Sequence, residues 1–326
     1  MNARKWLLPV VVFLTLFAAA GRLAADDHAG SFERTLKVTG PVELEITTGS
    51  GNIAVRSGDA SAVQVRGTIR VSRRVGAEAA QQKVQYLESN PPIEQSGNFI
   101  RVGRIPDPEM RRHISISYEI AVPAATRLRS ETGSGDQTIE NIKGPVKAST
   151  GSGSLHASGL EDEARLTTGS GDIELASLAG AVYAETGSGS IRAERLAGQV
   201  RAHTGSGDIH LEGSSIGPVK AETGSGNVEI HGVQGILNAQ TGSGSIIIQG
   251  EPRGDWKLET GSGNVMMQLP AQAGFSLYAH TGSGSINSNL PITVQGKLSR
   301  SELRGTVRGG GSLVEVGTGS GDIRIE

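Results

Sequence analysis

The chain has 326 residues, and its 31 basic and 33 acidic side chains give a formal charge of -2, which leaves no net field to attract nucleic acid or an anionic membrane. It has no cysteine, which excludes disulfides, thiolate metal ligands and cysteine nucleophiles. Aromatic residues make up only 3% and glycines number 47, a composition that favours a thin, layered interior over a bulky globular core.

Residues 1–25 have the pattern of a secretory signal peptide, with basic Arg4 and Lys5, an apolar run over 6–20, and small residues up to Ala25. The apolar run is shorter than the roughly 20 residues that a membrane-spanning helix needs, and an uncleaved anchor is the alternative. No later stretch is apolar for long enough to be a span. We therefore expect an exported protein, periplasmic or secreted, with no transmembrane span after signal removal.

Residues 26–131 are expected to hold an N-terminal coil and a cap or insertion. The pattern predicts a strand over 63–71, one short helix over 77–89 that stops at Asn90-Pro91-Pro92, and strands near 99–102 and 114–122. An open sheet edge needs a cover, so we interpret this region as the cap of the repeats that follow.

Residues 132–326 are organised by a tandem repeat. The motif T-G-S-G begins at Thr48, Thr132, Thr150, Thr168, Thr186, Thr204, Thr223, Thr241, Thr260, Thr281 and Thr318. From Thr132 to Thr281 the spacings are 18, 18, 18, 18, 19, 18, 19 and 21 residues. Each motif is followed by an alternating run, as in 171–175, and a second alternating run, as in 182–186, leads into the next motif.

This pattern predicts an all-β fold, a single-chain parallel β-solenoid (β-helix) with about 18 residues per coil. We favour a right-handed coil because crossovers between parallel strands nearly always have that hand, with the left-handed form as the alternative. Glycines such as Gly180 and Gly198 are expected to supply a positive φ at one corner. Inward alanines such as Ala184 and Ala202 predict a narrow cross-section.

The 37-residue gap between Thr281 and Thr318 is close to two periods, and we interpret it as one degenerate coil or hairpin. The chain then closes with a strand over 322–325. Trp256 and Phe275 fall on inward positions, which leaves few aromatic side chains to form a platform for sugar rings.

With these residues in view, the repeated T-G-S-G strands, continued by Asp, Ser or Asn and then Ile or Val, resemble the bacterial "putative adhesin" family of exported β-strand-repeat domains of unknown function. The likeness covers about residues 35–326. It implies a repetitive β fold and an adhesive or cell-envelope role. It supplies no catalytic residues to transfer.

One outward column is a candidate surface for binding. It lies just before the threonines and consists of Glu131, Glu185, His203, Glu222, Gln240, Glu259 and His280. Neighbours such as Glu185, His203 and Glu222 would be close enough to share a zinc ion or to act as an acid–base cluster. The simpler interpretation is a solvated ladder of pairs between coils, with no metal site.

Other glycine-rich chemistry is excluded by the pattern around the motif. No helix follows G-S-G to receive a phosphate. The residue after each motif is serine in some coils, as at Ser154 and Ser190, and serine cannot supply the anionic oxygens of a calcium ladder. Asp, Asn and Ser at this position are expected to be turn residues that bond to nearby backbone.

We therefore expect a non-enzymatic, adhesin-like or envelope-associated scaffold, monomeric and without cofactor. Its partner would be an unidentified macromolecule or cell surface, not nucleic acid. The alternative is a glycan-active β-helix enzyme, a lyase or hydrolase, with a cleft between the inserted region and the solenoid.

Overall fold

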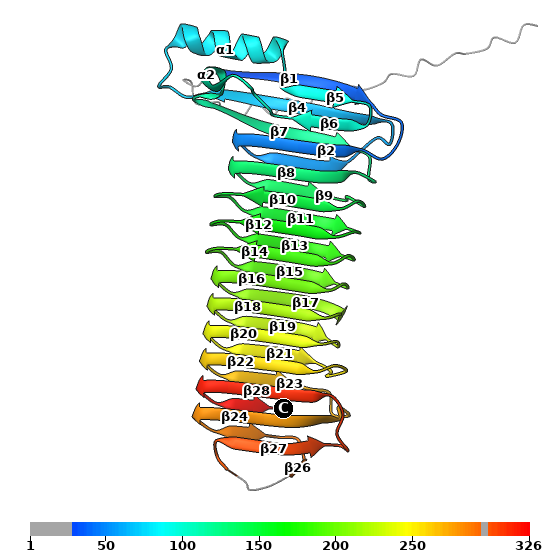
Figure 1. The fold of residues 1–326 in the computed structure, drawn as a ribbon, viewed down its shortest axis with the longest axis vertical. Helices are drawn as coiled ribbons and strands as arrows, with labels where there is room; N and C mark the ends of the chain where they lie inside the picture. The colour runs from blue at the N-terminus through cyan, green and yellow to red at the C-terminus, as the bar shows by residue number, and fades with distance from the viewer. Residues whose placement is uncertain (1–27, 295–298) are drawn as a thin grey trace, which may run out of the picture.

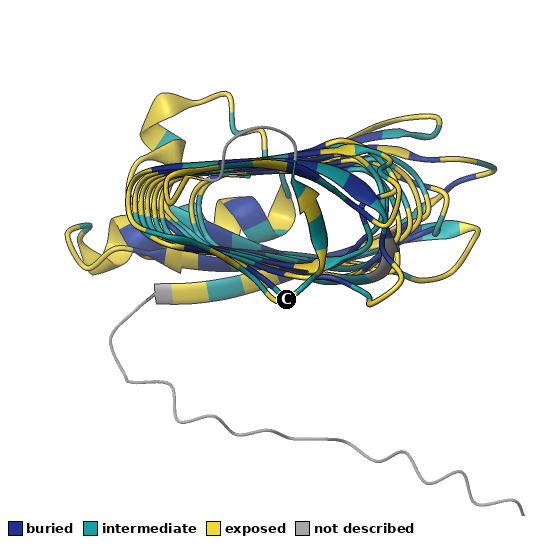
Figure 2. Ribbon diagram, turned by 90° about the horizontal axis from the view of Figure 1, so that it is seen from below, coloured by how far each residue is buried: buried dark blue, intermediate teal, exposed yellow. Residues whose placement is uncertain are grey.

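The computed structural model describes residues 28–294 and 299–326, so the predicted signal peptide over 1–25 lies outside the described residues. Two long sheets run face to face along a rod (Figure 1), and the view along the rod shows them as the opposite long walls of a flattened ring with buried residues between them (Figure 2). The prediction of an all-β, mostly parallel fold is confirmed.

Within the described residues the first sheet, sheet A, has 14 strands. In spatial order they are β1 (His28–Lys37), β4 (Ala62–Val71), β7 (Ile114–Val122), β3 (Ile53–Ser57), β9 (Gln137–Glu140), β11 (Leu155–Leu160), β13 (Ile173–Leu178), β15 (Ile191–Leu196), β17 (Ile209–Ile216), β19 (Val228–Val233), β21 (Ile246–Gly250), β23 (Val265–Gln268), β29 (Ile323–Ile325) and β25 (Ile286–Ser288).

The second sheet, sheet B, has 15 strands among the same residues. In spatial order they are β26 (Ile292–Val294), β27 (Glu302–Val307), β24 (Phe275–Ser283), β28 (Leu313–Ser320), β22 (Trp256–Ser262), β20 (Leu237–Ser243), β18 (Val219–Ser225), β16 (Val200–Ser206), β14 (Val182–Thr186), β12 (Ala164–Thr168), β10 (Val146–Thr150), β8 (Arg127–Ser134), β2 (Glu43–Ser50), β6 (Phe99–Val102) and β5 (Ile93–Ser96).

Successive repeats lie in register, each one rung further along the rod. Val146 pairs with Ala164, and Ala164 pairs with Val182, both in parallel strands. In β14 the side chains of Val182, Ala184 and Thr186 are buried while the two residues between them face outward. The period-two pattern of the sequence is therefore the inside–outside alternation of the walls.

The T-G-S-G motif forms one corner of each coil. Its threonine is buried and bonds to the coil before it: Thr186 Oγ1 donates to the carbonyl oxygen of Gly171, and Thr204 Oγ1 to that of Gly189, each at 2.8 Å. Backbones stack so closely here that a Cβ on Gly171 would collide with the carbonyl oxygen of Gly153. Each threonine thus satisfies a polar group inside the stack.

The prediction of a positive φ at Gly180 and Gly198 is wrong. At this corner the positive angles belong to Ser177 (61°) and Arg195 (55°), each directly before an inward leucine. Gly180 is needed for another reason, because a Cβ there would collide with the carbonyl oxygen of Asp162 in the preceding coil.

The N-terminal end carries the helix and strands predicted between residues 63 and 122. β4, α1 (Ala77–Ser89), β6 and β7 lie where the pattern placed them, and a further short helix, α2 (Pro108–Arg111), begins at the capping Asp107, whereas the sequence predicted one helix. β1, β4 and β7 pair antiparallel, and α1 packs against β1 and β4 through buried Ala80, Val84 and Leu87. Neither of these described helices is long and apolar enough to cross a membrane.

The C-terminal end departs from chain order. The gap after Thr281 holds the antiparallel strands β27 and β26, which extend sheet B beyond β24, in line with the predicted hairpin. The chain then turns back, and β28 lies between β22 and β24 while β29 lies between β23 and β25. The coil that starts at Thr318 is therefore inserted into the stack (Figure 1).

Candidate functional site

The predicted outward column lies on the solvent face of sheet B. Five of its members follow one another on consecutive strands: Glu185, His203, Glu222, Gln240 and Glu259. Glu131 is set apart, since Ser149 and Thr167 occupy the two rungs between it and Glu185. His280 is set apart as well, because the inserted β28 places Gly317 between it and Glu259.

Contacts within the column are those of a surface ladder. His203 Nδ1 lies 4.0 Å from Glu222 Oε2, and Gln240 Nε2 donates to Glu259 Oε2 at 3.0 Å. Glu222 is also paired with Lys220 at 2.8 Å. Among the described residues, no three or more His, Cys, Asp or Glu side chains are placed to hold a metal ion, and this includes Glu185, His203 and Glu222.

A second column on the same face, two residues earlier in each strand, was missed in the sequence. We call it the basic stripe, and it runs over six consecutive strands from β8 to β18. Its members are Arg129, Lys147, Arg165, Tyr183, Arg201 and Lys220. The signal that could have found it is the same alternation, applied to the outward residue nearer the start of each strand.

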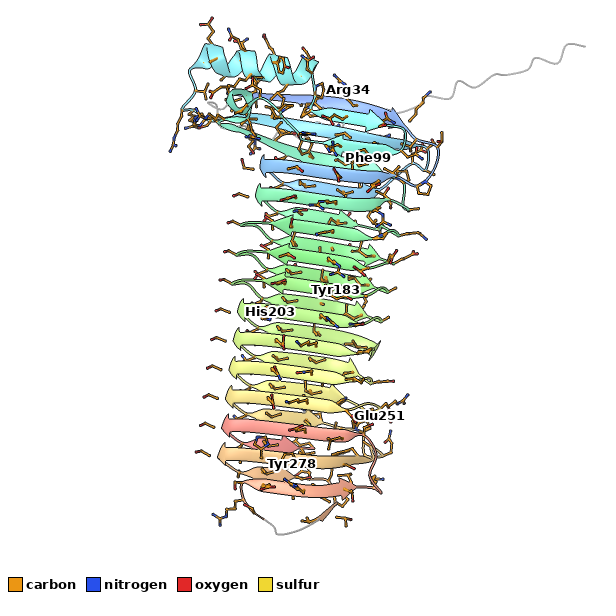
Figure 3. All side chains as sticks on the ribbon, in the orientation of Figure 1. Arg34, Phe99, Tyr183, His203, Glu251 and Tyr278 are labelled. Carbon is orange, nitrogen blue, oxygen red and sulfur yellow. The ribbon has the colours of Figure 1, made fainter. Side chains whose placement is uncertain are left out.

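Tyr183 is held between two cations of the basic stripe. The guanidinium carbon of Arg165 lies 4.3 Å from its ring centroid, and that of Arg201 lies 5.8 Å from it. Figure 3 places Tyr183 and His203 midway along the rod. A shallow hollow of about 370 Å³ includes Tyr183, His203 and several cations of the stripe in its lining.

At the N-terminal end of the basic stripe, the cationic side chains form no ion pairs within the described part of the chain. Arg129 and Lys147 are exposed and form no ion pair with any described residue, whereas Arg165 is paired with Glu163. The rungs of Lys147 and Arg165 carry Ser149 and Thr167 in the neighbouring column, so no carboxylate faces them there. At Lys147 an anionic ligand would therefore meet little competition from the protein's own acids, whereas Arg129 has Glu45 opposite it on β2 and Glu131 two residues later on its own strand.

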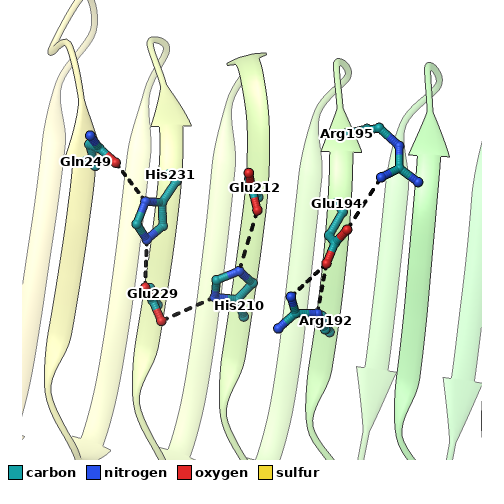
Figure 4. Close-up of polar contacts among 8 residues, drawn as sticks. All are labelled: Arg192, Glu194, Arg195, His210, Glu212, Glu229, His231 and Gln249. Atoms are coloured by element: carbon teal, nitrogen blue, oxygen red, sulfur yellow. Dashed lines mark hydrogen bonds and ion pairs between the residues drawn. The ribbon is translucent and has the colours of Figure 1, made fainter.

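The solvent face of sheet A carries a different arrangement, in which charges are paired with one another (Figure 4). His210 Nδ1 lies 3.2 Å from Glu229 Oε2, and His231 Nε2 lies 2.7 Å from Glu229 Oε1. His231 Nδ1 also lies 2.8 Å from Gln249 Oε1. On β15, which pairs with the strand that carries His210, Arg192 and Arg195 share Glu194 at 2.7 and 3.5 Å.

We call the row of His210, Glu229, His231 and Gln249 the sheet A ladder. Its contacts shift the pKa values of Glu229 and His231. Hydrogen bonding by His231, with a further contribution from His210, holds the pKa of Glu229 below its ordinary value. Burial alone would lower the pKa of His231, but its hydrogen bonds with Glu229 and Gln249 outweigh burial and raise that pKa. The sheet A ladder is thus stabilised in its charged form, and its charged groups are paired with one another.

Comparison with known proteins gives a family match over most of the rod. The family model described as Toastrack DUF4097 matches residues 113–211 and again residues 179–326. A search of curated proteins returned no match.

Three solved structures resemble the chain distantly. A "putative cell adhesion protein" of Clostridium sporogenes is 13% identical with a TM-score of 0.19, covering 90% of this chain and 98% of its own. A "putative adhesin" of Bacteroides fragilis is 11% identical with a TM-score of 0.30, covering 91% and 97%. A "putative lipid binding protein" of Parabacteroides distasonis is 11% identical with a TM-score of 0.37, covering 90% and 96%. Likenesses this distant do not say what the present chain binds.

Proposed function

The chain belongs to the Toastrack DUF4097 family, and from this premise we propose that it is a non-enzymatic binding scaffold that holds a linear anionic polymer along the solvent face of sheet B. The basic stripe is the observation that carries the proposal. A cell-surface polysaccharide built from acidic sugars is the partner whose chemistry fits it best.

The spacing of the stripe supports a polymer over a small ligand. Neighbouring strands in a sheet lie about 4.8 Å apart, so a column with one side chain per strand repeats at about that interval. One sugar of a linear chain is about as long as the distance between neighbouring strands. Successive carboxylates of the polymer therefore match the spacing of successive cations in the stripe. Each exposed contact is weak, but several contacts on one rigid rod add up to useful avidity.

The contrast between the two walls supports the choice of sheet B. On sheet A, Arg192 and Arg195 are already engaged by Glu194, and two histidines are engaged by Glu229. On sheet B, Arg129 and Lys147 have no such partner among the described residues. The ring of Tyr183 contacts Arg165 and Arg201 and so helps to hold these two cations in the stripe.

The proposal includes the localisation and architecture that the sequence suggested. The protein would be exported after removal of residues 1–25, and would act as a monomer with a cap region over 26–131 and a right-handed solenoid of about 18 residues per coil over 132–326. Fractionation of the producing cell, with N-terminal sequencing of the recovered protein, tests export. Recovery of the intact chain in the cytoplasm would contradict it.

Binding to polygalacturonate, with neutral dextran as the comparison, tests the proposed partner. The double variant Lys147→Glu/Arg165→Glu should weaken polygalacturonate binding by at least about tenfold, because two attractive contacts become repulsive. The matched control Arg56→Glu/Arg324→Glu changes net charge by the same amount on sheet A, and should weaken it by less than about threefold.

Two results would overturn the proposal. Equal weakening by both double variants would show that only net charge matters, and binding to dextran as tight as to polygalacturonate would show that charge does not matter. Shortening of the polysaccharide by the purified protein would contradict the non-enzymatic role and favour the glycan-active alternative.

A further inference from the structure

A second site is built at the N-terminal end of the rod, beyond the last member of the basic stripe, and one of its lining residues, Arg101, lies two strands from Arg129. A cavity of about 540 Å³ lies beside the segment 103–113, which crosses from β6 in sheet B to β7 in sheet A. Its lining comes from β2 and β6 on one side, from the crossing segment itself, and from β7 on the other side. Small-molecule pockets typically have volumes of about 300–1,000 Å³.

The interior of this cavity is apolar with one unsatisfied polar group. Ile105, Ile114 and Ile116 line it, and so does Tyr118, which is 1% exposed. The Tyr118 hydroxyl has no hydrogen-bond partner among the described residues. It lies beside Gly103, another lining residue, where an added Cβ would be 3.2 Å from the hydroxyl oxygen.

An unpartnered buried hydroxyl is costly for a folded protein, because the group has lost its water partners and gained none. Such groups are rare in folded proteins, and a bound partner is one explanation for such a group. Burial also raises the pKa of Tyr118, so the group stays a neutral phenol that can donate a hydrogen bond to an anion. Tyr118 is thus equipped to bind an oxygen that the protein does not supply.

The mouth of the cavity is positive. Arg104 and Arg111 line it, are exposed, and have no side-chain partner among the described residues. Arg101 also lines it, but Glu45 at 3.0 Å and Glu94 at 3.3 Å neutralise that guanidinium. None of the residues in the lining is acidic. Arginine presents a planar fork of donors that suits carboxylate and phosphate oxygens.

We propose that this cavity binds an amphiphilic anion, with a carboxylate or phosphate head held by Arg104, Arg111 and the Tyr118 hydroxyl, and an apolar body packed against the three isoleucines. The arginines draw the head to the mouth and the isoleucines exclude water from its tail. This site does not depend on the polymer-binding role, because it shares no residue with the basic stripe.

Calorimetric titration of the purified protein tests the proposal with four probes, which are decanoate and decyl phosphate below their micelle concentrations, decanol, and inorganic phosphate. Both amphiphilic anions should bind at least about tenfold more tightly than decanol or inorganic phosphate, since each of these two lacks one half of the recognised chemistry. The relative affinities of decanoate and decyl phosphate show which head group is preferred.

Three variants localise the binding. Arg104→Gln/Arg111→Gln should weaken both anions by at least about tenfold, and Tyr118→Phe by about three- to tenfold. Tyr118→Phe removes only the unpartnered hydroxyl, so it should fold at least as well as the parent. The matched control Arg74→Gln/Arg112→Gln removes two arginines that lie outside the lining and should leave the affinities unchanged.

The proposal is overturned if neither anion binds, if decanol or inorganic phosphate binds as tightly as the anions, or if the control pair weakens binding as much as Arg104→Gln/Arg111→Gln. An unchanged affinity in Tyr118→Phe, with folding confirmed by circular dichroism, would remove the hydroxyl from the site and overturn its assigned role.

Discussion

The two ends of the rod cover their open sheets in different ways. At the N-terminal end, antiparallel β4 and β1 extend sheet A, and helix α1 packs on them with Leu87 buried. At the C-terminal end, β27 and β26 extend sheet B alone, and Ile292 and Leu303 stay only partly buried. Antiparallel strands therefore suffice to end a sheet, whereas the helix adds a second packed layer at one end only.

Both ends nevertheless share one device. The T-G-S-G coil nearest each end of the chain lies inside the stack: β2 pairs with both β6 and β8, and β28 pairs with both β22 and β24. A coil with neighbours on both sides buries its apolar side chains completely, as Val316 does. The segments between β3 and β8 and between β23 and β28 form rungs outside these coils, and β1 adds the outermost strand of sheet A at the N-terminal end.

The largest expected effect comes from a charge in the inserted coil. Val316 is fully buried and pairs with Leu258 and Ala279, so Val316→Asp should lower the free energy of unfolding by more than about 4 kcal/mol. Val294 on the outermost strand β26 is the matched control, and Val294→Asp should cost less than about 1 kcal/mol. Urea unfolding followed by the fluorescence of Trp256, a neighbour of β28, measures both. Equal small losses would show that β28 does not lie inside the stack.

A smaller difference in stability is expected between substitutions in helix α1, at the N-terminal end, and in strand β27, at the C-terminal end. Leu87→Ala removes a fully buried side chain from α1 and should cost about 2–5 kcal/mol. Leu303→Ala on β27 removes a partly buried one and should cost about 1 kcal/mol. Hydrogen exchange should show that Leu87→Ala exposes β1 and β4 first, because α1 packs on them. Similar losses in both variants would mean that the helix contributes no more than the hairpin.

The smallest expected effect is on the pH dependence of stability, which should respond to His231 in the rod and not to His113 at the N-terminal end. The raised pKa of His231 means that its contribution to stability is complete below its ordinary value of 6.5 and disappears as pH rises through the folded-state pKa. The lowered pKa of Glu229 means that its contribution is present above its ordinary value of 4.5 and is lost as pH falls through the folded-state pKa. Stability from this ladder should therefore be greatest between these two ordinary values.

His231→Gln should flatten the decline of stability above pH 6.5, by less than about 1 kcal/mol because the pair is largely at the surface. The measurement is the free energy of unfolding at a series of pH values. His113→Asn at the N-terminal end is the control, since no described carboxylate forms an ion pair with His113, and asparagine tolerates its positive φ of 62°. A pH profile that His231→Gln leaves unchanged would remove the ladder as its cause.

Sequence reasoning located most elements because their signals are local. The helix over 77–89 and the strand over 114–122 have the predicted bounds, since a proline pair and a period-two run mark them. Helix α2 was missed because it is a single turn, begun by the Asp107 cap and short of any periodic signal. The residues of the outward column lie on one face of sheet B, but the separation of His280 from Glu259 depends on a strand that comes 33 residues or more after His280 in the chain.

The repeat unit by itself determined the paired sheets, the inward threonines and the glycine corners, because identical units can bury their apolar faces only against copies of themselves. Only the tertiary structure decided the order of the rungs at the ends and the gathering of Arg104, Arg111 and Tyr118 around one cavity. The reason is physical: hydrogen bonds between strands are the same whichever coil is the neighbour, so stacking order follows from the apolar surface that can be covered, and position along the chain does not set it.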